Sequence, residues 1–95
     1  METATMKIVR KHIVFHGYVQ GVGFRWRALN AANSIGCTGK CTNEWDGTVE
    51  MEIQGTKEMI DKVIEMIERG RYVEITRMDV TDMPVDERER SFWVG

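Results

Sequence analysis

The segment KHIVFHGYVQGVGFRWRALNAANSIG, residues 11–36, joins two expected elements through a glycine-rich turn. Residues 11–19 alternate, with Ile13 and Phe15 on one side, and this pattern predicts a half-buried strand. Residues 24–35 repeat apolar side chains at helical spacing, and Gly36 follows where helices commonly end. The segment therefore predicts a strand, a turn and a helix in this order.

The rest of the chain continues the same kind of pattern. We expect strands at residues 37–43 and 48–55, joined by a hairpin turn at Asp46-Gly47. We expect a helix at about residues 57–69, with Thr56 as its N-cap. A strand follows at residues 73–80, where a switch in the parity of the apolar positions indicates a β-bulge. Phe92 and Val94 indicate a short final edge strand.

This order of elements predicts an α+β fold of the ferredoxin-like, split β-α-β type. The arrangement is βαββαβ with a short fifth strand, and two helices pack on one face of an antiparallel sheet. We expect residues 1–10 to contain a flexible N-terminal segment and the start of the first strand. Residues 11–95 form the single folded domain of this prediction.

Composition limits the function classes. The chain has 95 residues, 42% of them hydrophobic, and a formal net charge of −2. A net negative charge argues against a general affinity for nucleic acid, which normally needs a basic face. Apolar runs are too short to span a bilayer, and the first residues lack the pattern of a signal peptide. We therefore expect a cytoplasmic protein with no membrane or nucleic-acid partner. We also expect a monomer, although nothing in the composition determines the oligomeric state.

Cys37 and Cys41 are the two cysteines of the sequence. On one extended strand they lie roughly 13 Å apart, and a disulfide needs Cα atoms within about 7 Å. We expect buried thiols that act as small hydrophobic side chains. His12 and His16 share the outward face of the first strand without an acidic partner in their run, so we expect solvated side chains and no metal site.

The run QGVGFR, residues 20–25, has the composition of an anion site. Gly21 and Gly23 allow the backbone to turn so that successive N–H groups point into one hollow. The helix that starts near Phe24 adds unpaired N–H groups and the positive end of its dipole. Arg25 in its first turn is able to make two parallel hydrogen bonds to phosphate oxygens. A glycine-rich turn before a helix is also often only a turn.

Asn43 is the candidate partner of this loop. It ends the second expected strand, and the topology is able to bring that end toward the glycine-rich turn. An asparagine side chain has an acceptor and a donor, so it is suited to holding a water molecule, although it does not titrate as a base. The alternative is that Asn43 only begins the hairpin turn.

An RNA-binding module of the four-stranded type is a competing interpretation of the same fold. Such modules stack bases on aromatic side chains of the central strands. The strand TVEMEIQG, residues 48–55, has no aromatic residue and presents Glu50 and Glu52 outward. These carboxylates would repel a phosphate backbone, so this interpretation is disfavoured.

The run GYVQGVGFR, from Gly17 to Arg25, resembles the signature of the acylphosphatase family, G-x-V-Q-G-V-x-F-R, at every fixed position. Residues 39–43, GKCTN, followed by DGTV at residues 46–49, are similar to the family's second element, G-W-V-[KR]-N with a later G-x-V. The similarity extends from about residue 11 to residue 94.

This resemblance implies the hydrolysis of acyl phosphates to a carboxylate and inorganic phosphate, without a metal or an organic cofactor. The partners it implies are a small-molecule acyl phosphate and the phosphate product. It implies that Arg25 and Asn43 are catalytic. The phosphate-binding residues that it implies, largely through main-chain N–H groups, are Gln20, Gly21, Val22, Gly23, Phe24 and Arg25.

The second element departs from the family pattern. Lys40 stands where the family usually has Trp, and Thr42 stands where it has Lys or Arg. We expect Trp26 to pack rather than to recognise a ligand, and Arg27 to be a solvated helix charge. We expect Lys40 on the strand face opposite Cys41, and we expect Trp45 to pack on the surface. Trp45 as a cover for the acyl group is the alternative. The other function that fits is a non-catalytic module of the same fold that binds phosphate or carbamoyl phosphate.

Overall fold

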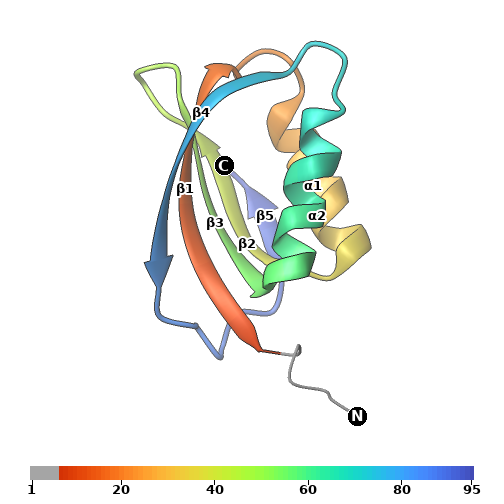
Figure 1. Cartoon of the computed structure of the whole chain (residues 1–95), viewed down its shortest axis with the longest axis vertical. Coiled ribbons are helices and arrows are strands. Elements are labelled where there is room, and N and C mark those ends of the chain that lie inside the picture. Colours follow the sequence, from red (N-terminus) through yellow and green to blue (C-terminus); the bar gives the residue numbers. More distant parts are fainter. Residues whose placement is uncertain (1–6) are drawn as a thin grey trace.

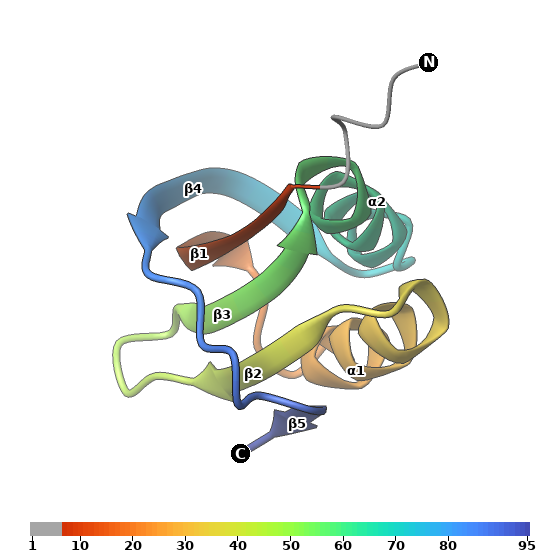
Figure 2. The ribbon, with the colours of Figure 1, turned by 90° about the horizontal axis from the view of Figure 1, so that it is seen from below.

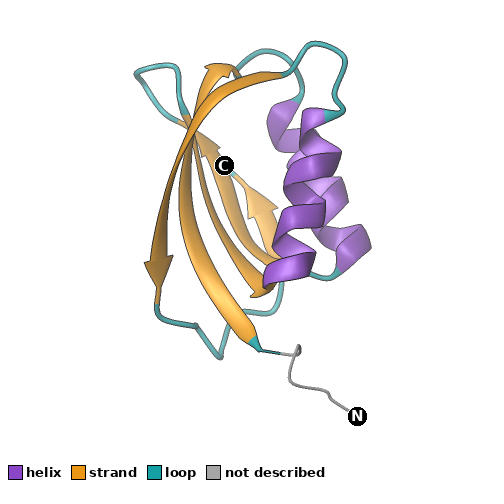
Figure 3. Cartoon of the chain, viewed as in Figure 1, coloured by secondary structure: helices purple, strands orange, loops and turns teal. Residues whose placement is uncertain are grey.

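The computed structural model describes residues 7–95, and its elements follow the predicted order (Figures 1 and 3). The helices α1 and α2 lie on the same face of the sheet. The elements are β1 (Ile8–Tyr18), α1 (Phe24–Ile35), β2 (Thr38–Asn43), β3 (Val49–Thr56), α2 (Lys57–Glu68), β4 (Glu74–Met83) and β5 (Phe92–Val94). Residues 1–6 of the expected flexible segment lie outside the described residues. No helix among residues 7–95 is long and apolar enough to cross a membrane.

The sheet has the strand order β4-β1-β3-β2-β5. The β1–β3, β1–β4 and β2–β3 pairs are antiparallel as predicted, but β5 pairs with β2 in parallel. The sheet is therefore mixed, which corrects the prediction of a wholly antiparallel one. The cause is visible in Figure 2, where the chain leaves β4 at one edge and crosses below the sheet to the other edge. It thus enters β5 in the direction of β2.

The core lies between the sheet and the helices. Ile13 and Phe15 of β1 are buried there with Met51 and Ile53 of β3, as the alternation predicts. Cys37 and Cys41 are buried free thiols, which confirms the prediction for them. Burial raises the pKa of Cys37 to about 11 and that of Cys41 to about 12, so neither thiol is ionised near neutral pH.

The parity switch of the fourth strand corresponds to a register shift against β1. His16 pairs with Arg77 and Gly17 pairs with Ile75, so Thr76 is the extra residue of a β-bulge. Gly17 has φ +125°, and a Cβ there would lie 2.1 Å from the Glu74 carbonyl oxygen. Only glycine fits at this point of the bulge.

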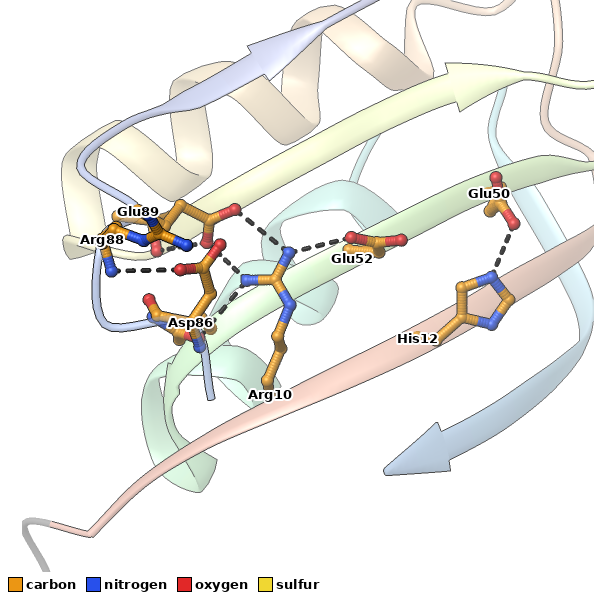
Figure 4. Close-up of polar contacts among 9 residues, drawn as sticks. Arg10, His12, Glu50, Glu52, Asp86, Arg88 and Glu89 are labelled. Atoms are coloured by element: carbon orange, nitrogen blue, oxygen red, sulfur yellow. Dashed lines mark hydrogen bonds and ion pairs between the residues drawn. The ribbon is translucent and has the colours of Figure 1, made fainter. Parts of the chain in front are cut away.

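A buried ion network anchors the connection between β4 and β5 (Figure 4). The guanidinium of Arg10, which is 6% exposed, donates to Glu52 at 2.8 Å and to Glu89 at 2.6 Å. The Gln54 side chain adds two hydrogen bonds to the main chain of Asp86. The hydrogen bond to Glu89 raises the pKa of Arg10. This network holds residues 84–91 across the end of the sheet, and so it places β5.

The two histidines differ from the prediction. His12 Nε2 lies 2.6 Å from Glu50 Oε2, and His16 Nε2 lies 2.9 Å from Asp79 Oδ2. The acidic partners come from neighbouring strands rather than from the same run, which is why the sequence pattern missed them. No group of three His, Cys, Asp or Glu side chains that could hold a metal ion is found within residues 7–95.

Candidate active site

The loop before α1 has the backbone alternation of an anion nest. Gly21 has φ +73° and Gly23 has φ +81°, whereas Val22 between them does not have a positive φ. Alternation of this kind turns successive N–H groups toward one side. A Cβ at either glycine would meet nothing within 4 Å, so their requirement for glycine comes from the backbone angle and not from crowding.

The two helices start differently. At α2, the Thr56 side chain accepts a hydrogen bond from the Met59 N–H at 3.1 Å, and Glu58 lies in the first turn. At α1, the N-cap is Gly23, no side chain within residues 7–95 caps the end, and the first turn contains no acidic residue. The N–H groups at the start of α1 therefore remain available to an external anion.

Arg25 lies in the first turn of α1 and lines a hollow beside the loop. Its Nη1 donates to the main-chain oxygen of Gly95. Within residues 7–95, no Asp or Glu side chain forms an ion pair with it. Since a guanidinium has five N–H donors, most of its donors remain for another acceptor.

Asn43 is the last residue of β2, where it pairs with Val49. Its side chain is exposed and lines the same hollow as Arg25. In Figure 1 the β1–α1 loop and the β2–β3 hairpin lie at the same end of the molecule. The expected approach of Asn43 to the glycine-rich loop is thus present.

Gln20 links these two segments. Its side-chain Nε2 donates to the main-chain oxygens of Glu44 at 2.7 Å and Thr48 at 2.9 Å. Both acceptors lie in the β2–β3 hairpin. The Gln20 side chain therefore ties the loop to the hairpin, and only its main-chain N–H is left for the phosphate-binding role implied by the resemblance.

Phe24 anchors the loop from below. It is 2% exposed, and its ring centroid lies 4.8 Å from that of Phe15 in the core. Aromatic pairs at this separation add stability beyond their buried area. This contact fixes the first residue of α1, and thereby the direction of Arg25 beside it.

The hollow has a volume of about 360 Å³. Of the predicted site residues, Gly21, Gly23, Phe24, Arg25 and Asn43 line it, whereas Gln20 and Val22 do not. Val22 instead packs partly buried against the core. The lining residues that the sequence did not predict are Val19, Trp26, Val94 and Gly95.

Lys40 and Thr42, which depart from the family pattern, and the neighbouring Trp45 do not line the hollow. Lys40 is on the sheet face opposite Cys41, as predicted, with its Nζ 6.0 Å from the Trp93 ring centroid. Thr42 donates to the Glu44 carboxylate at 3.1 Å. Trp45 is 96% exposed, so the predicted surface packing of this side chain is wrong. None of the three lines the hollow.

The model of the acylphosphatase family matches residues 11–94 of the chain. This chain belongs to the acylphosphatase family. An acylphosphatase of Bifidobacterium longum is 43% identical to it over 89 residues, which are 92% of each chain. An acylphosphatase of Geobacillus kaustophilus is 37% identical over 84 residues, 87% of this chain and 89% of that protein.

Solved structures of acylphosphatases have the same fold. The crystal structure of the Bacillus subtilis acylphosphatase matches with a TM-score of 0.82 at 27% identity, over 92% of this chain and 98% of that one. A structure of full-length HypF in a phosphate- and nucleotide-bound form matches with a TM-score of 0.82 at 25% identity. That match covers 95% of this chain but 12% of the HypF chain. The predicted ferredoxin-like fold and acylphosphatase family are confirmed.

Proposed function

We propose that Arg25, Asn43 and the main-chain N–H groups of residues 20–24 carry out the acylphosphatase reaction of this chain. The activity itself, hydrolysis of acyl phosphates, follows from membership of the family. The observation that supports these roles is that Arg25, Asn43 and the two loop glycines line one hollow. The monomeric state and the cytoplasmic location expected from the sequence stay predictions.

The chemistry requires little from the protein beyond positioning. An acyl phosphate is already activated, because a carboxylate leaves readily. The water oxygen attacks phosphorus in line, and the bond between phosphorus and the acyl oxygen breaks. The carboxylate leaves with the electron pair of that bond. Positioning and charge stabilisation dominate catalysis in phosphoryl transfer of this kind.

Each residue has a separate role in this proposal. The guanidinium of Arg25 and the loop N–H groups hold the phosphoryl oxygens while charge redistributes over them. Asn43 accepts a hydrogen bond from the attacking water and orients it. Asn43 does not accept the proton, so a phosphoryl oxygen of the substrate takes it as the new bond forms.

The test is the hydrolysis of benzoyl phosphate by the wild type and by the Arg25→Ala and Asn43→Ala variants. Arg25→Ala should weaken substrate binding and lower kcat, because the guanidinium contacts the phosphoryl group throughout. Asn43→Ala should lower mainly kcat, because the attacking water loses the acceptor that orients it. The expected loss is about 100- to 1000-fold, comparable to that of removing one well-placed hydrogen-bonding group. Arg69→Ala and Asn33→Ala, which change exposed residues outside the hollow, are the matched controls.

Equal weak activity in the wild type and in both site variants would contradict these roles. The non-catalytic alternative, a phosphate- or carbamoyl-phosphate-binding module, predicts a different result. Inorganic phosphate would then raise the midpoint of thermal unfolding of the wild type while no substrate was turned over.

A further inference from the structure

The hollow beside Arg25 has two kinds of lining. Arg25, Asn43 and the loop glycines provide polar groups, and Val19, Phe24, Trp26 and Val94 provide apolar ones. Val19 and Phe24 are 1% and 2% exposed, so they contribute almost no accessible surface. The apolar surface that a ligand meets comes from Trp26, which is 67% exposed, and from half-buried Val94.

The position of Trp26 relates it directly to the phosphoryl site. Trp26 follows Arg25 in the first turn of α1. It also borders a second hollow of about 320 Å³ between the helices, lined further by Arg27, Asn30, Ala31, Ser34 and Met66. The indole therefore forms the boundary between two depressions. Because it is so exposed, a role in packing the core does not account for a tryptophan at this position.

The predicted roles of Trp26 and Arg27 are thus wrong. Trp26 is not packed, and Arg27 is not a freely solvated helix charge. The Nη2 of Arg27 donates to the Met66 carbonyl oxygen at 3.1 Å, which joins α1 to α2. Asn30 Nδ2 donates to the main-chain oxygen of Trp26 at 3.0 Å. These bonds stabilise the turn of α1 that carries the indole.

We propose that Trp26, together with Val94, binds the acyl group of the substrate and makes this enzyme selective for acyl phosphates with a flat, apolar acyl group. This inference rests on the proposed function, in which Arg25 holds the phosphoryl group. The acyl carbon is one oxygen away from phosphorus, so the acyl group lies against residues that adjoin Arg25. An aryl group that packs on an indole gains binding free energy in addition to that of its buried area. An acetyl group is too small to cover it.

The test is the ratio of kcat/KM for benzoyl phosphate to kcat/KM for acetyl phosphate. Trp26→Ala should lower this ratio about tenfold, the size expected for an aromatic contact plus its buried area. Trp26→Phe should retain most of it. Trp45→Ala is the matched control, because that indole is 96% exposed and lines neither hollow, and it should leave the ratio unchanged.

The ratio is measured on one preparation, so the fraction of folded protein cancels from it, and a less stable variant remains informative. An unchanged ratio in Trp26→Ala would overturn the inference, as would an equal fall with Trp45→Ala. The competitive inhibition constant of inorganic phosphate should stay the same in Trp26→Ala, and a large rise would assign the indole to the phosphate site instead. Failure of the wild type to hydrolyse either substrate would contradict the proposed function and not the acyl preference alone.

Discussion

Arg10 of β1 and Arg25 of α1 have opposite surroundings. Arg10 is buried and donates to Glu52, Gln54 and Glu89. Arg25 donates to one main-chain oxygen, that of Gly95, and lines an open hollow. A guanidinium whose donors are used by carboxylates holds the chain together. One without a carboxylate remains able to bind an anion.

The helix starts repeat this distinction. The N-terminus of α2 is capped by Thr56, whereas that of α1 has no side-chain cap. The unsatisfied helix end lies beside the two glycines with positive φ. The guanidinium of Arg25, which has no acidic side-chain partner within residues 7–95, lies at the same place in the chain. The uncapped helix end and a guanidinium without an acidic side-chain partner thus converge where a phosphate is expected.

The largest expected effect is that of Arg25→Lys. This change should lower kcat/KM for benzoyl phosphate by about 100- to 1000-fold, or about 3–4 kcal/mol, because an ammonium cannot make the bidentate contact. The free energy of unfolding, measured with urea, should stay the same. Arg69→Lys, at an exposed arginine that pairs with Glu65, is the control. A lysine variant with nearly wild-type activity would show that charge alone suffices at this position.

The next largest effect is that of Arg10→Ala, which should lower the free energy of unfolding and leave the catalytic activity of the folded protein unchanged. Removing one partner of a buried ion network leaves Glu52 and Glu89 unpaired, which costs about 3 kcal/mol of unfolding free energy. Urea denaturation measures this loss, and the folded variant should still hydrolyse benzoyl phosphate. Lys57→Ala, which breaks an exposed pair with Asp61, should cost much less, because solvent screens an exposed ion pair. A stable but inactive Arg10→Ala variant would contradict this, because Arg10 would then serve activity and not stability.

Thr56→Ala should have a smaller effect. Loss of the hydrogen bond between Thr56 and the Met59 N–H should lower the unfolding free energy by about 1 kcal/mol. The inhibition constant of inorganic phosphate should be unchanged, since this helix end takes no part in the hollow. If phosphate binding weakened as much as stability, the two helix starts would not be functionally distinct.

The smallest effect concerns the pH dependence of the hairpin beside Asn43. Hydrogen bonds from the Thr48 side chain and main chain lower the pKa of Asp46. A carboxyl whose pKa is lower in the folded chain stabilises it above the ordinary pKa, and this stabilisation disappears as the pH falls through the folded value. Urea denaturation should show Asp46→Ala slightly destabilised at pH 7, with a smaller difference at about pH 3.

Thr48→Val removes one of the donors and should reduce the same pH dependence. A difference between wild type and Asp46→Ala that stays constant over this pH range would contradict the assignment. The two hydrogen bonds from Thr48 engage Asp46 within its own turn, and Asp46 does not line the hollow.

Local patterns predicted the elements because each depends on neighbouring residues. The alternation at Ile13 and Phe15, the helical spacing after Phe24 and the cap at Thr56 are all features of short windows of sequence. The bulge at Thr76 was predictable because a register shift changes the parity of the apolar positions. The approach of Asn43 to the loop was also predictable, because it follows from the connection of β1 through α1 to β2.

The remaining features depend on contacts between distant segments. The carboxylates near His12 and His16 belong to other strands, and the parallel direction of β5 depends on where residues 84–91 cross the sheet. Val94 and Gly95 enter the hollow only through that crossing. The exposure of Trp26 and Trp45 was also not predictable. Neither the type of a residue nor its spacing from other apolar residues determines which distant segments cover its side chain.

The two hydrogen bonds of the Gln20 side chain have a consequence for motion. They join the glycine-rich loop to the β2–β3 hairpin, so one segment cannot open far without breaking contacts of the other. The two segments should therefore fluctuate as one cooperative unit, with amide protons that exchange with solvent at similar rates. In Gln20→Ala these exchange rates should separate, and the geometry between guanidinium and carboxamide would then vary from one turnover to the next.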